Sequence, residues 1–572
     1  MKRIYIHSLL MLVFVFAANA QTKSLAKANK YYGAKAYAEA IPLYEKALKK
    51  DANNKVILAN LGDCYRLTNN VPGQLKCYEK LISSGNAQEI HKLYYGQALT
   101  ESGQKENATK YFEEYLADAR GKVLASSTAK AKMYTKNADA YQVTLAGFNS
   151  EQNDFSAVKF MDEVIFVSSR NRTKWINTKH AWTGESFTKV YTYQSAGENY
   201  ENVVKLFMGD LNSKYNDGPV CFSDEGRKVY FTRNNFGSKY KSKDGTYKLK
   251  IFEASLNYSG FDSVAIMSFV TNDDNFAHPT VSKDGNTMYF VSDMPGGFGG
   301  LDIYVCKREA NGEWGGCTNL GITVNTPGNE MFPFIADDGK LYFSSNGHDG
   351  LGGLDVYEAK MKDGKPVKIY NMGEPVNSVH DDFSYWLDET GMKGFVSSNR
   401  KNGGMDDDVY NLTVLRKVSR GKNVIFVLKD KDNGEVIPNV KLKINGDTGT
   451  TNDKGEFAYL LEDDVEYMVT ANNEKYFTGK DSLNTKVTEE DEFTREIKLE
   501  KDPKLSFLAF VTDVKSKQGL EGVKIEIKDL FANTVFDNTV TGTNGEYRKS
   551  LKGMKIGDKV AFSIKLSKEG YV

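Results

Sequence analysis

Three glycine-rich loops, each followed by an aspartate, are the first residues in this sequence whose types and spacing suggest chemistry. The aspartates are Asp302, Asp355 and Asp408, and each precedes an apolar–tyrosine pair that begins a strand-like run. Such loops could hold a ligand or a single cation, but stacked calcium turns are excluded because successive loops lie 53 residues apart. Glycine permits positive φ between strands, and aspartate accepts hydrogen bonds from loop amides. We therefore predict structural hairpin loops, with a ligand or cation site as the alternative.

Patterns typical of catalysis are largely missing from the sequence. It contains no Gly-x-Ser-x-Gly nucleophile turn, no His-Glu-x-x-His zinc helix and no phosphate loop ending in Gly-Lys-Ser/Thr. His380, Asp381 and Asp382 could form an acid–base cluster. Asp382, however, aligns with Asp154 and Glu330 at the entry of a repeated strand unit, which favours a structural role. We predict that the chain is not an enzyme and has no metal site and no cofactor.

Cys306 and Cys317 are the cysteines placed to form a disulfide. They lie symmetrically about an Asn311-Gly312 turn, so they face each other across a predicted hairpin. Counting outward from the turn places them at a hydrogen-bonded pair, where the two side chains are less favourably aimed. The sequence therefore leaves open whether this pair is bridged.

Two tryptophans, Trp175 and Trp182, lie in an insertion over residues 170–189. Tryptophans exposed on a rim are good anchors for a protein partner, because they bury a large apolar area. Packing beneath the insertion is an equally good interpretation. Both tryptophans are candidate partner-binding residues.

The elements that must position these residues begin with a helical repeat over residues 21–120. Its period is 34 residues, and small and large apolar side chains recur at fixed offsets. The clearest of these are Ala28, Tyr31, Ala40, Leu61, Gly62, Tyr65, Tyr95, Gly96 and Leu99. This pattern resembles the tetratricopeptide family, in which helix pairs stack into a solenoid. A stretch from Val123 to Tyr141 is predicted to form the capping helix, so this part spans residues 21–141.

The tetratricopeptide resemblance implies that the concave face of the helices binds a partner. The positions that correspond to the family's binding residues are Asn29, Tyr32, Asp63, Arg66, Gln97 and Glu101. At each position, solvated helix surface is the alternative interpretation.

Residues 142–415 repeat a unit of short strands five times. The second strand of each unit has Ser or Thr as its last or second-to-last residue, as in residues 164–169 and 340–345. Periods of this size with short strands indicate propeller blades, and the units resemble TolB-type, WD-like β-propeller repeats. The segment 142–149 resembles the strands that end the third and fourth units, and none follows the fifth. We therefore predict a five-bladed ring closed by this segment, which removes an exposed edge.

Residues 420–500 alternate apolar and polar side chains and turn at Asn/Asp-Gly pairs. They resemble the small carboxypeptidase-regulatory-like β-sandwich of exported proteins, and residues 504–572 look like a second copy that is truncated. The predicted fold class is thus multidomain: an all-α tetratricopeptide solenoid, a five-bladed β-propeller, and two Ig-like or regulatory-like sandwiches, the last incomplete.

The first residues predict export of the protein. A basic start, an apolar run and Ala18-Asn19-Ala20 are typical of a signal peptide over residues 1–20. The chain contains 75 basic and 75 acidic residues, so the charge balance gives no support for a nucleic-acid partner.

This order of modules resembles the OmpA-family periplasmic proteins of Bacteroidota, including the PorE type associated with type IX secretion and gliding. The resemblance implies a non-enzymatic scaffold in the periplasm, associated with the outer membrane. Its partner would be an outer-membrane barrel or a type IX secretion or gliding protein, and a C-terminal domain absent here would bind peptidoglycan. The alternatives are a ligand- or glycan-binding propeller sensor and an accessory subunit of an exported hydrolase.

Overall fold

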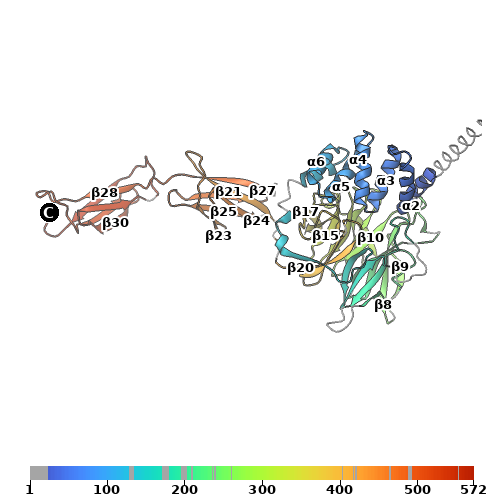
Figure 1. Ribbon diagram of the computed structural model, residues 1–572. Coiled ribbons are helices and arrows are strands. Elements are labelled where there is room, and N and C mark those ends of the chain that lie inside the picture. The colour runs from blue at the N-terminus through green and yellow to red at the C-terminus, as the bar shows by residue number, and fades with distance from the viewer. Residues whose placement is uncertain are drawn as a thin grey trace, which may run out of the picture. The chain divides into compact units, whose positions relative to one another are not determined.

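The computed structural model divides the chain into two compact units, residues 1–418 and 419–572 (Figure 1). No helix in the described part of the chain is long and apolar enough to cross a membrane. The predicted signal peptide lies outside the described residues. The structure describes residues 24–571 except 128–133, 171–178, 195–202, 208–209, 463–464, 487–491 and the single residues 224, 235, 238, 239, 259, 402, 417, 419, 420 and 552.

The first unit begins with a stack of helix pairs. The pairs fit closely because glycine faces an aromatic ring: a Cβ on Gly62 would lie 2.6 Å from Tyr78 Cε1, and one on Gly96 would lie 2.5 Å from Phe112 Cε1. The side chain of Asn54 caps one helix by accepting hydrogen bonds from two backbone amides. After a helix over residues 24–33, the helices are α2 (Tyr37–Leu48), α3 (Lys55–Leu67), α4 (Val71–Ser83), α5 (Glu89–Glu101), α6 (Lys105–Glu114) and α7 (Arg120–Ser127). The predicted capping helix at Val123–Tyr141 is therefore seen only in part.

The rest of the first unit is β-rich, and its described strands form five four-stranded antiparallel sheets. The first two sheets contain β2 (Asp154–Phe160), β3 (Glu163–Ser168), β4 (Lys189–Gln194), β5 (Val203–Leu206), β6 (Asp217–Ser223), β7 (Lys228–Asn234), β8 (Leu249–Asn257) and β9 (Gly260–Ile266). The next two contain β10 (Phe276–Val281), β11 (Thr287–Ser292), β12 (Asp302–Arg308), β13 (Trp314–Asn319), β14 (Glu330–Ile335), β15 (Leu341–Ser345), β16 (Asp355–Lys362) and β17 (Lys365–Asn371). The fifth contains β18 (Asp382–Leu387), β19 (Lys393–Ser398), β20 (Asp408–Val414) and β1 (Tyr141–Leu145).

The first strands of the five sheets contact one another in a closed order, β2, β6, β10, β14, β18 and back to β2. We call this arrangement the sheet ring; it is consistent with the propeller that the sequence predicts. β1 pairs antiparallel with β20, from Tyr141 opposite Val414 to Leu145 opposite Tyr410. The prediction that the segment before the first sheet completes the last one is therefore confirmed.

Every first strand carries a one-residue β-bulge where it faces the ring axis. Four residues other than glycine adopt positive φ there: Ser156 (53°), His278 (52°), Phe332 (49°) and Ser384 (51°). A bulge bends its strand and turns nearby side chains to a new direction. The bulges therefore decide which side chains meet on the axis.

The structure joins Cys306 and Cys317 in a disulfide. The register of β12 against β13 shifts between Val305 and Lys307, so the regular pairing assumed from the turn does not hold at Cys306. The two Cα atoms lie 4.2 Å apart, close to the spacing of a non-hydrogen-bonded pair. The irregularity of the hairpin thus removes the unfavourable geometry expected from the sequence.

The second unit contains two successive groups of facing sheets. In the first group, β24-β21-β27 and β23-β22-β25-β26 share one apolar core, and β21 pairs with β27 in parallel. In the second group the sheets are β28-β31 and β30-β29-β32. The strands are β21 (Lys422–Asp430), β22 (Lys441–Ile444), β23 (Asp447–Thr450), β24 (Glu456–Leu461), β25 (Glu466–Asn472), β26 (Gly479–Asn484), β27 (Glu492–Leu499), β28 (Ser506–Phe510), β29 (Lys524–Asp529), β30 (Thr534–Val540), β31 (Glu546–Ser550) and β32 (Phe562–Ser567).

Candidate functional site

Two of the predicted groove residues, Asp63 and Arg66, belong to a network inside the helical repeat. The Asp63 carboxylate accepts hydrogen bonds from the hydroxyls of Tyr32 (2.8 Å) and Tyr78 (2.6 Å). The Arg66 guanidinium lies 3.9 Å from the centre of the Tyr94 ring. Because these contacts join helices within and between successive pairs, Tyr32, Asp63 and Arg66 hold the stack together, and a substitution at any of them alters the fold as well as the surface.

The other three groove residues differ in how far they are available to a partner. Asn29 Oδ1 accepts a hydrogen bond from the hydroxyl of Tyr44 at 2.7 Å. Glu101 ends α5 beside the sheet ring, where burial and the nearby Asp381 carboxylate raise its pKa to about 8. Gln97 is half-buried, and its amide has no hydrogen-bond partner within the described residues. The role of all six residues in partner binding stays a prediction.

Trp182 fixes the helices to the sheet ring. Its Nε1 donates a hydrogen bond to the carbonyl oxygen of Leu67 at 2.8 Å, and its own carbonyl accepts one from the amide of Ala38. The edge of its ring lies against Tyr37, with centroids 4.9 Å apart. Of the two interpretations of Trp182, packing is therefore the one that the structure supports. Its indole is not an exposed anchor. Trp175 lies outside the described residues.

Further contacts bind the helical part to the same end of the ring. The Tyr134 hydroxyl donates to Asp349 Oδ2 at 3.2 Å, and the Glu374 amide donates to the carbonyl oxygen of Tyr134 at 2.7 Å. The contact residues of the ring lie in loops after second strands or before first strands, and such loops share one end of an antiparallel sheet. Figure 1 shows α2–α6 along this end. The opposite end of the ring holds the turns between first and second strands.

The glycine-loop aspartates have unequal contacts. Asp302 accepts hydrogen bonds from the amides of Phe298 and Gly299, at 2.5 and 3.1 Å. Asp355 accepts from the amides of Leu351 and Gly352, at 2.7 and 3.3 Å. Asp408 is paired instead with Lys401, whose Nζ lies 3.3 Å from Oδ2. No group of three or more His, Cys, Asp or Glu side chains in the described ranges is arranged to hold a metal ion.

A repeated connection, Asn-Ser/Thr-x-x-x-Asp/Glu, joins neighbouring sheets and was not recognised as a motif from the sequence. The asparagine side-chain amide forms two hydrogen bonds with the backbone of one residue in the preceding sheet. Asn325, for example, accepts from the amide of Ile303 and donates to its carbonyl oxygen. The Ser or Thr bonds the buried acid four residues later, as Thr326 does with Glu330. The four copies begin at Asn149, Asn212, Asn325 and Asn377. Their recurrence before four of the five first strands was the signal available in the sequence.

In three of these connections an arginine neutralises the buried acid. Arg170 Nη2 lies 2.7 Å from Asp154 Oδ1, and Arg233 Nε lies 2.6 Å from Asp217 Oδ1. Asp382 is paired in the same way with Arg400, which explains why it does not form an acid–base cluster with His380. All three acids are fully buried. Arg170 and Arg400 follow the second strands of their units, and Arg233 lies near the end of one; the sequence analysis missed all three.

Glu330 is the buried acid of these connections that has no arginine partner among the described residues. Its carboxylate accepts hydrogen bonds from the Thr326 amide (2.8 Å), the Thr326 hydroxyl (2.7 Å) and the Ser345 hydroxyl (2.6 Å). Burial raises the pKa of Glu330 from 4.5 to about 7, although these hydrogen bonds oppose the shift. Its ionised form is therefore disfavoured in the folded protein.

Glu330→Gln should stabilise the protein at pH 8 and change little at pH 5. Because the folded pKa of Glu330 lies above the unfolded value, its burial costs nothing well below pH 4.5, and the cost grows as pH rises through about 7. We expect a gain on the order of 2 kcal/mol at pH 8, from urea unfolding curves at the two pH values. Glu546→Gln, at an exposed position, is the control. An equal change in stability at both pH values would contradict the raised pKa of Glu330.

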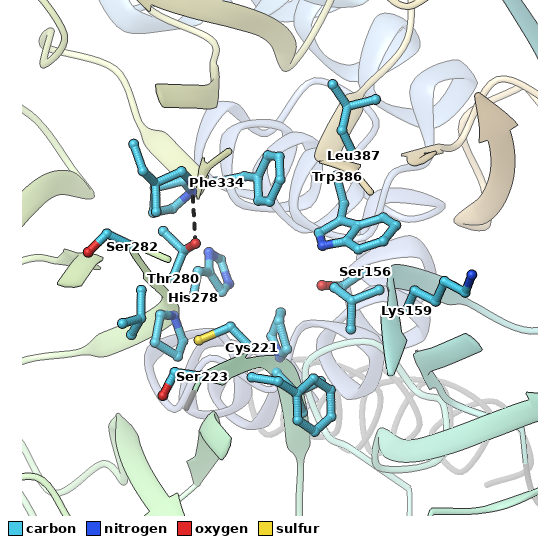
Figure 2. Close-up of a pocket in the computed structure, with 18 of the residues that line it drawn as sticks. Ser156, Lys159, Cys221, Ser223, His278, Thr280, Ser282, Phe334, Trp386 and Leu387 are labelled. Atoms are coloured by element: carbon cyan, nitrogen blue, oxygen red, sulfur yellow. Dashed lines mark hydrogen bonds between the residues drawn. The ribbon is translucent and has the colours of Figure 1, made fainter. Parts of the chain in front are cut away.

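An axial pocket opens at the end of the ring opposite the helices. It has a volume of about 320 Å³ and is lined by residues of all five first strands, including Ser156, Cys221, His278, Phe334 and Trp386. Figure 2 shows Ser156, His278, Phe334 and Trp386, each from a different strand, around an open centre. The charged residues that line the pocket are all exposed to solvent: Lys159, Glu225, Lys283, Asp337 and Glu389.

Stacked rings lie beside the innermost part of the pocket. The His278 and Phe332 rings are parallel with centroids 3.8 Å apart, and Phe332 contacts Phe383 at 4.8 Å. Phe155 lies next to Phe383, with centroids 6.1 Å apart. We call these four rings the aromatic cluster. They come from four different first strands, so side chains from separate sheets meet beside the pocket.

The fold and these sites define a protein with an N-terminal helical region that contains a tetratricopeptide repeat, followed by a large β-rich part made of many small antiparallel sheets. The Tetratricopeptide repeat family matches residues 31–73. No curated protein is similar enough to the sequence to match it.

Several solved structures are similar to parts of the chain. A putative TolB from Agrobacterium tumefaciens is 15% identical, covers 58% of this chain and 98% of its own, and has a TM-score of 0.29. The shaft pilin SpaA from Lactobacillus rhamnosus GG is 15% identical over 23% of this chain and 82% of its own, with a TM-score of 0.16. These scores are too low to carry an argument about function.

Two hydrolases are also among the similar structures. A prolyl endopeptidase is 12% identical over 74% of this chain and 60% of its own, with a TM-score of 0.24. Puromycin hydrolase is 10% identical, covers 66% of this chain and 59% of its own, and has a TM-score of 0.26. This finding contradicts our prediction that the chain is not an enzyme. The missing motifs exclude only the particular catalytic arrangements that they encode.

Proposed function

We propose that this protein is a docking protein of the cell envelope, in which the helical repeat and a five-bladed β-propeller act as one binding body. The observation that carries the proposal is the attachment of the helices to the ring through Trp182. This attachment holds the groove residues at a fixed place relative to the sheets. A partner would thus meet one preorganised surface, which lowers the entropy lost on binding.

The resemblance to OmpA-family periplasmic proteins of Bacteroidota, and to their PorE type, supports a finer proposal. The partner is an outer-membrane barrel or a component of type IX secretion or gliding. The protein then acts in the periplasm next to the outer membrane, and its two C-terminal groups of sheets are regulatory-like sandwiches. In such proteins a further C-terminal domain binds peptidoglycan. Attachment to peptidoglycan is therefore part of the proposal. The predicted signal peptide and the order of modules are its support.

Gln97→Arg should reduce recovery of the partner severalfold. Gln97 lies on α5 at a predicted groove position, and its side chain has no hydrogen-bond partner among the described residues. The substitution therefore changes the groove while leaving the Asp63 network intact. The measurement is crosslinking of the full-length protein in native envelopes, followed by purification and mass spectrometry.

Asn107→Arg on α6 is the matched control, because it adds the same charge to an exposed position outside the groove. Recovery of a barrel or secretion protein with wild type and Asn107→Arg, and its loss with Gln97→Arg, would support the proposal. Equal recovery from all three proteins would place docking elsewhere. Recovery of no envelope protein from any of them would overturn the function itself.

A further inference from the structure

The axial pocket presents several hydrogen-bond donors that no described residue of the protein satisfies. Ser156 is 3% exposed and Ser384 is 8% exposed, and neither hydroxyl has a partner among the residues that the structure describes. The same holds for the indole Nε1–H of Trp386. All three residues line the pocket, and Figure 2 shows the Ser156 hydroxyl directed toward its centre. Buried donors of this kind need a ligand or water to accept from them.

His278 adds a fourth donor whose protonation state is fixed by its surroundings. Its Nδ1 accepts a hydrogen bond from the Phe332 amide at 3.3 Å, so the proton of the neutral ring lies on Nε2. Burial lowers the pKa of His278 to about 3, and the ring stays neutral throughout the physiological range. Nε2–H has no partner in the described part of the chain. The inner pocket therefore carries donors and no positive charge.

Aromatic and proline side chains form part of the pocket wall beside these donors. Trp386 and Phe334 contact each other with centroids 6.3 Å apart, and Pro219, Pro279 and Pro333 also line the pocket. An anionic ligand would lack a cation near the donors, and a purely apolar side chain would leave the donors unpaired. The chemistry that fits is an uncharged ring with oxygen acceptors around its edge and an apolar face.

We propose that the axial pocket binds one neutral sugar ring at the end of a glycan. The sugar hydroxyl oxygens accept from Ser156, Ser384 and His278, with Trp386 Nε1–H as a further donor, and the C–H face lies against the aromatic wall. The volume of about 320 Å³ is at the small end of ligand pockets and suits a single ring. A pocket of this size has room for the last ring of a sugar chain, so we assign a terminal sugar. This activity is independent of docking through the helical groove.

Titration of the full-length protein with glucose, N-acetylglucosamine, cellobiose and chitobiose tests the proposal by calorimetry. We expect one of these sugars to bind, and Trp386→Phe to weaken its affinity by about threefold to tenfold, since the ring remains but one donor is lost. Trp314→Phe is the matched control, because Trp314 is buried on β13 and does not line the pocket. Ser384→Ala should weaken binding by a similar factor, with circular dichroism to confirm that both variants fold.

Absence of binding for all four sugars at about 10 mM would overturn the proposal. Sugar binding that Trp386→Phe and Ser384→Ala leave unchanged would also overturn it, because the sugar would then lie elsewhere. The peptide Gly-Gly-Trp amide is tested in parallel. If the peptide binds in a Trp386-dependent way and the sugars do not, the pocket accepts a protruding side chain and the sugar assignment is wrong.

Discussion

Replacing Arg170 with methionine should lower the free energy of unfolding of the sheet ring by about 3–5 kcal/mol. The substitution leaves the Asp154 carboxylate buried without its cation, 2.7 Å from where the guanidinium had been. It also removes the hydrogen bond from Arg170 Nη2 to the carbonyl oxygen of Phe148, at 2.8 Å, which holds the chain between β1 and β2. Urea unfolding followed by tryptophan fluorescence measures the loss.

The double variant Asp154→Asn/Arg170→Met should recover much of this stability, because no unpaired charge remains in the interior. Arg227→Met is the control, since Arg227 is mostly exposed and lies 3.6 Å from an exposed glutamate. That control should change stability by no more than about 0.5 kcal/mol. An equally small effect of Arg170→Met would show that the buried pair does not stabilise the ring.

Replacing Trp182 with alanine should separate the unfolding of the helices from that of the ring. The variant loses the hydrogen bond to Leu67 and the contact with Tyr37, and we expect the helical part to be destabilised by about 2–4 kcal/mol. Calorimetry should then show an earlier transition for the helices, and hydrogen exchange should become faster in α2–α4 than in the ring strands.

Trp182→Phe distinguishes the two contributions of the indole. It keeps an aromatic ring against Tyr37 but cannot donate to the Leu67 carbonyl oxygen, so the expected loss is only about 1 kcal/mol. A single unchanged transition in Trp182→Ala would mean that the other contacts, such as Tyr134 with Asp349, are enough to hold the helices on the ring.

The repeats could be predicted from the sequence because each one produces a local pattern of residue types at a fixed spacing. The helix pairs follow from small residues such as Gly62 and Gly96 at a fixed period, where a large partner ring must fit. The pairing of β1 with β20 also followed, since a strand that ends the third and fourth units had no counterpart after the fifth. Such features need no knowledge of which distant residues meet.

The axial pocket and the attachment of the helices could not be predicted in this way. The pocket forms only where five distant strands converge, and positive φ at Ser156 or Phe332 has no signal in the sequence, because these residues rarely adopt it. Trp182 lies in an insertion whose sequence does not distinguish an exposed anchor from a packed one. Its contact with Leu67 depends on how the helices pack against the sheet ring. The sequence pattern of neither part predicts that packing.

The pairing of β1 with β20 has a mechanical consequence for a protein pulled by its two ends. Tyr141 lies opposite Val414, so tension that enters through the preceding and the following chain reaches the same end of this strand pair. The hydrogen bonds of the pair are then loaded one after another, as in a zipper, and do not resist together as they would in shear. Since the disulfide closes only the β12–β13 hairpin, no covalent bond among the described residues protects this seam. Under force, the seam is the place where the ring would begin to open.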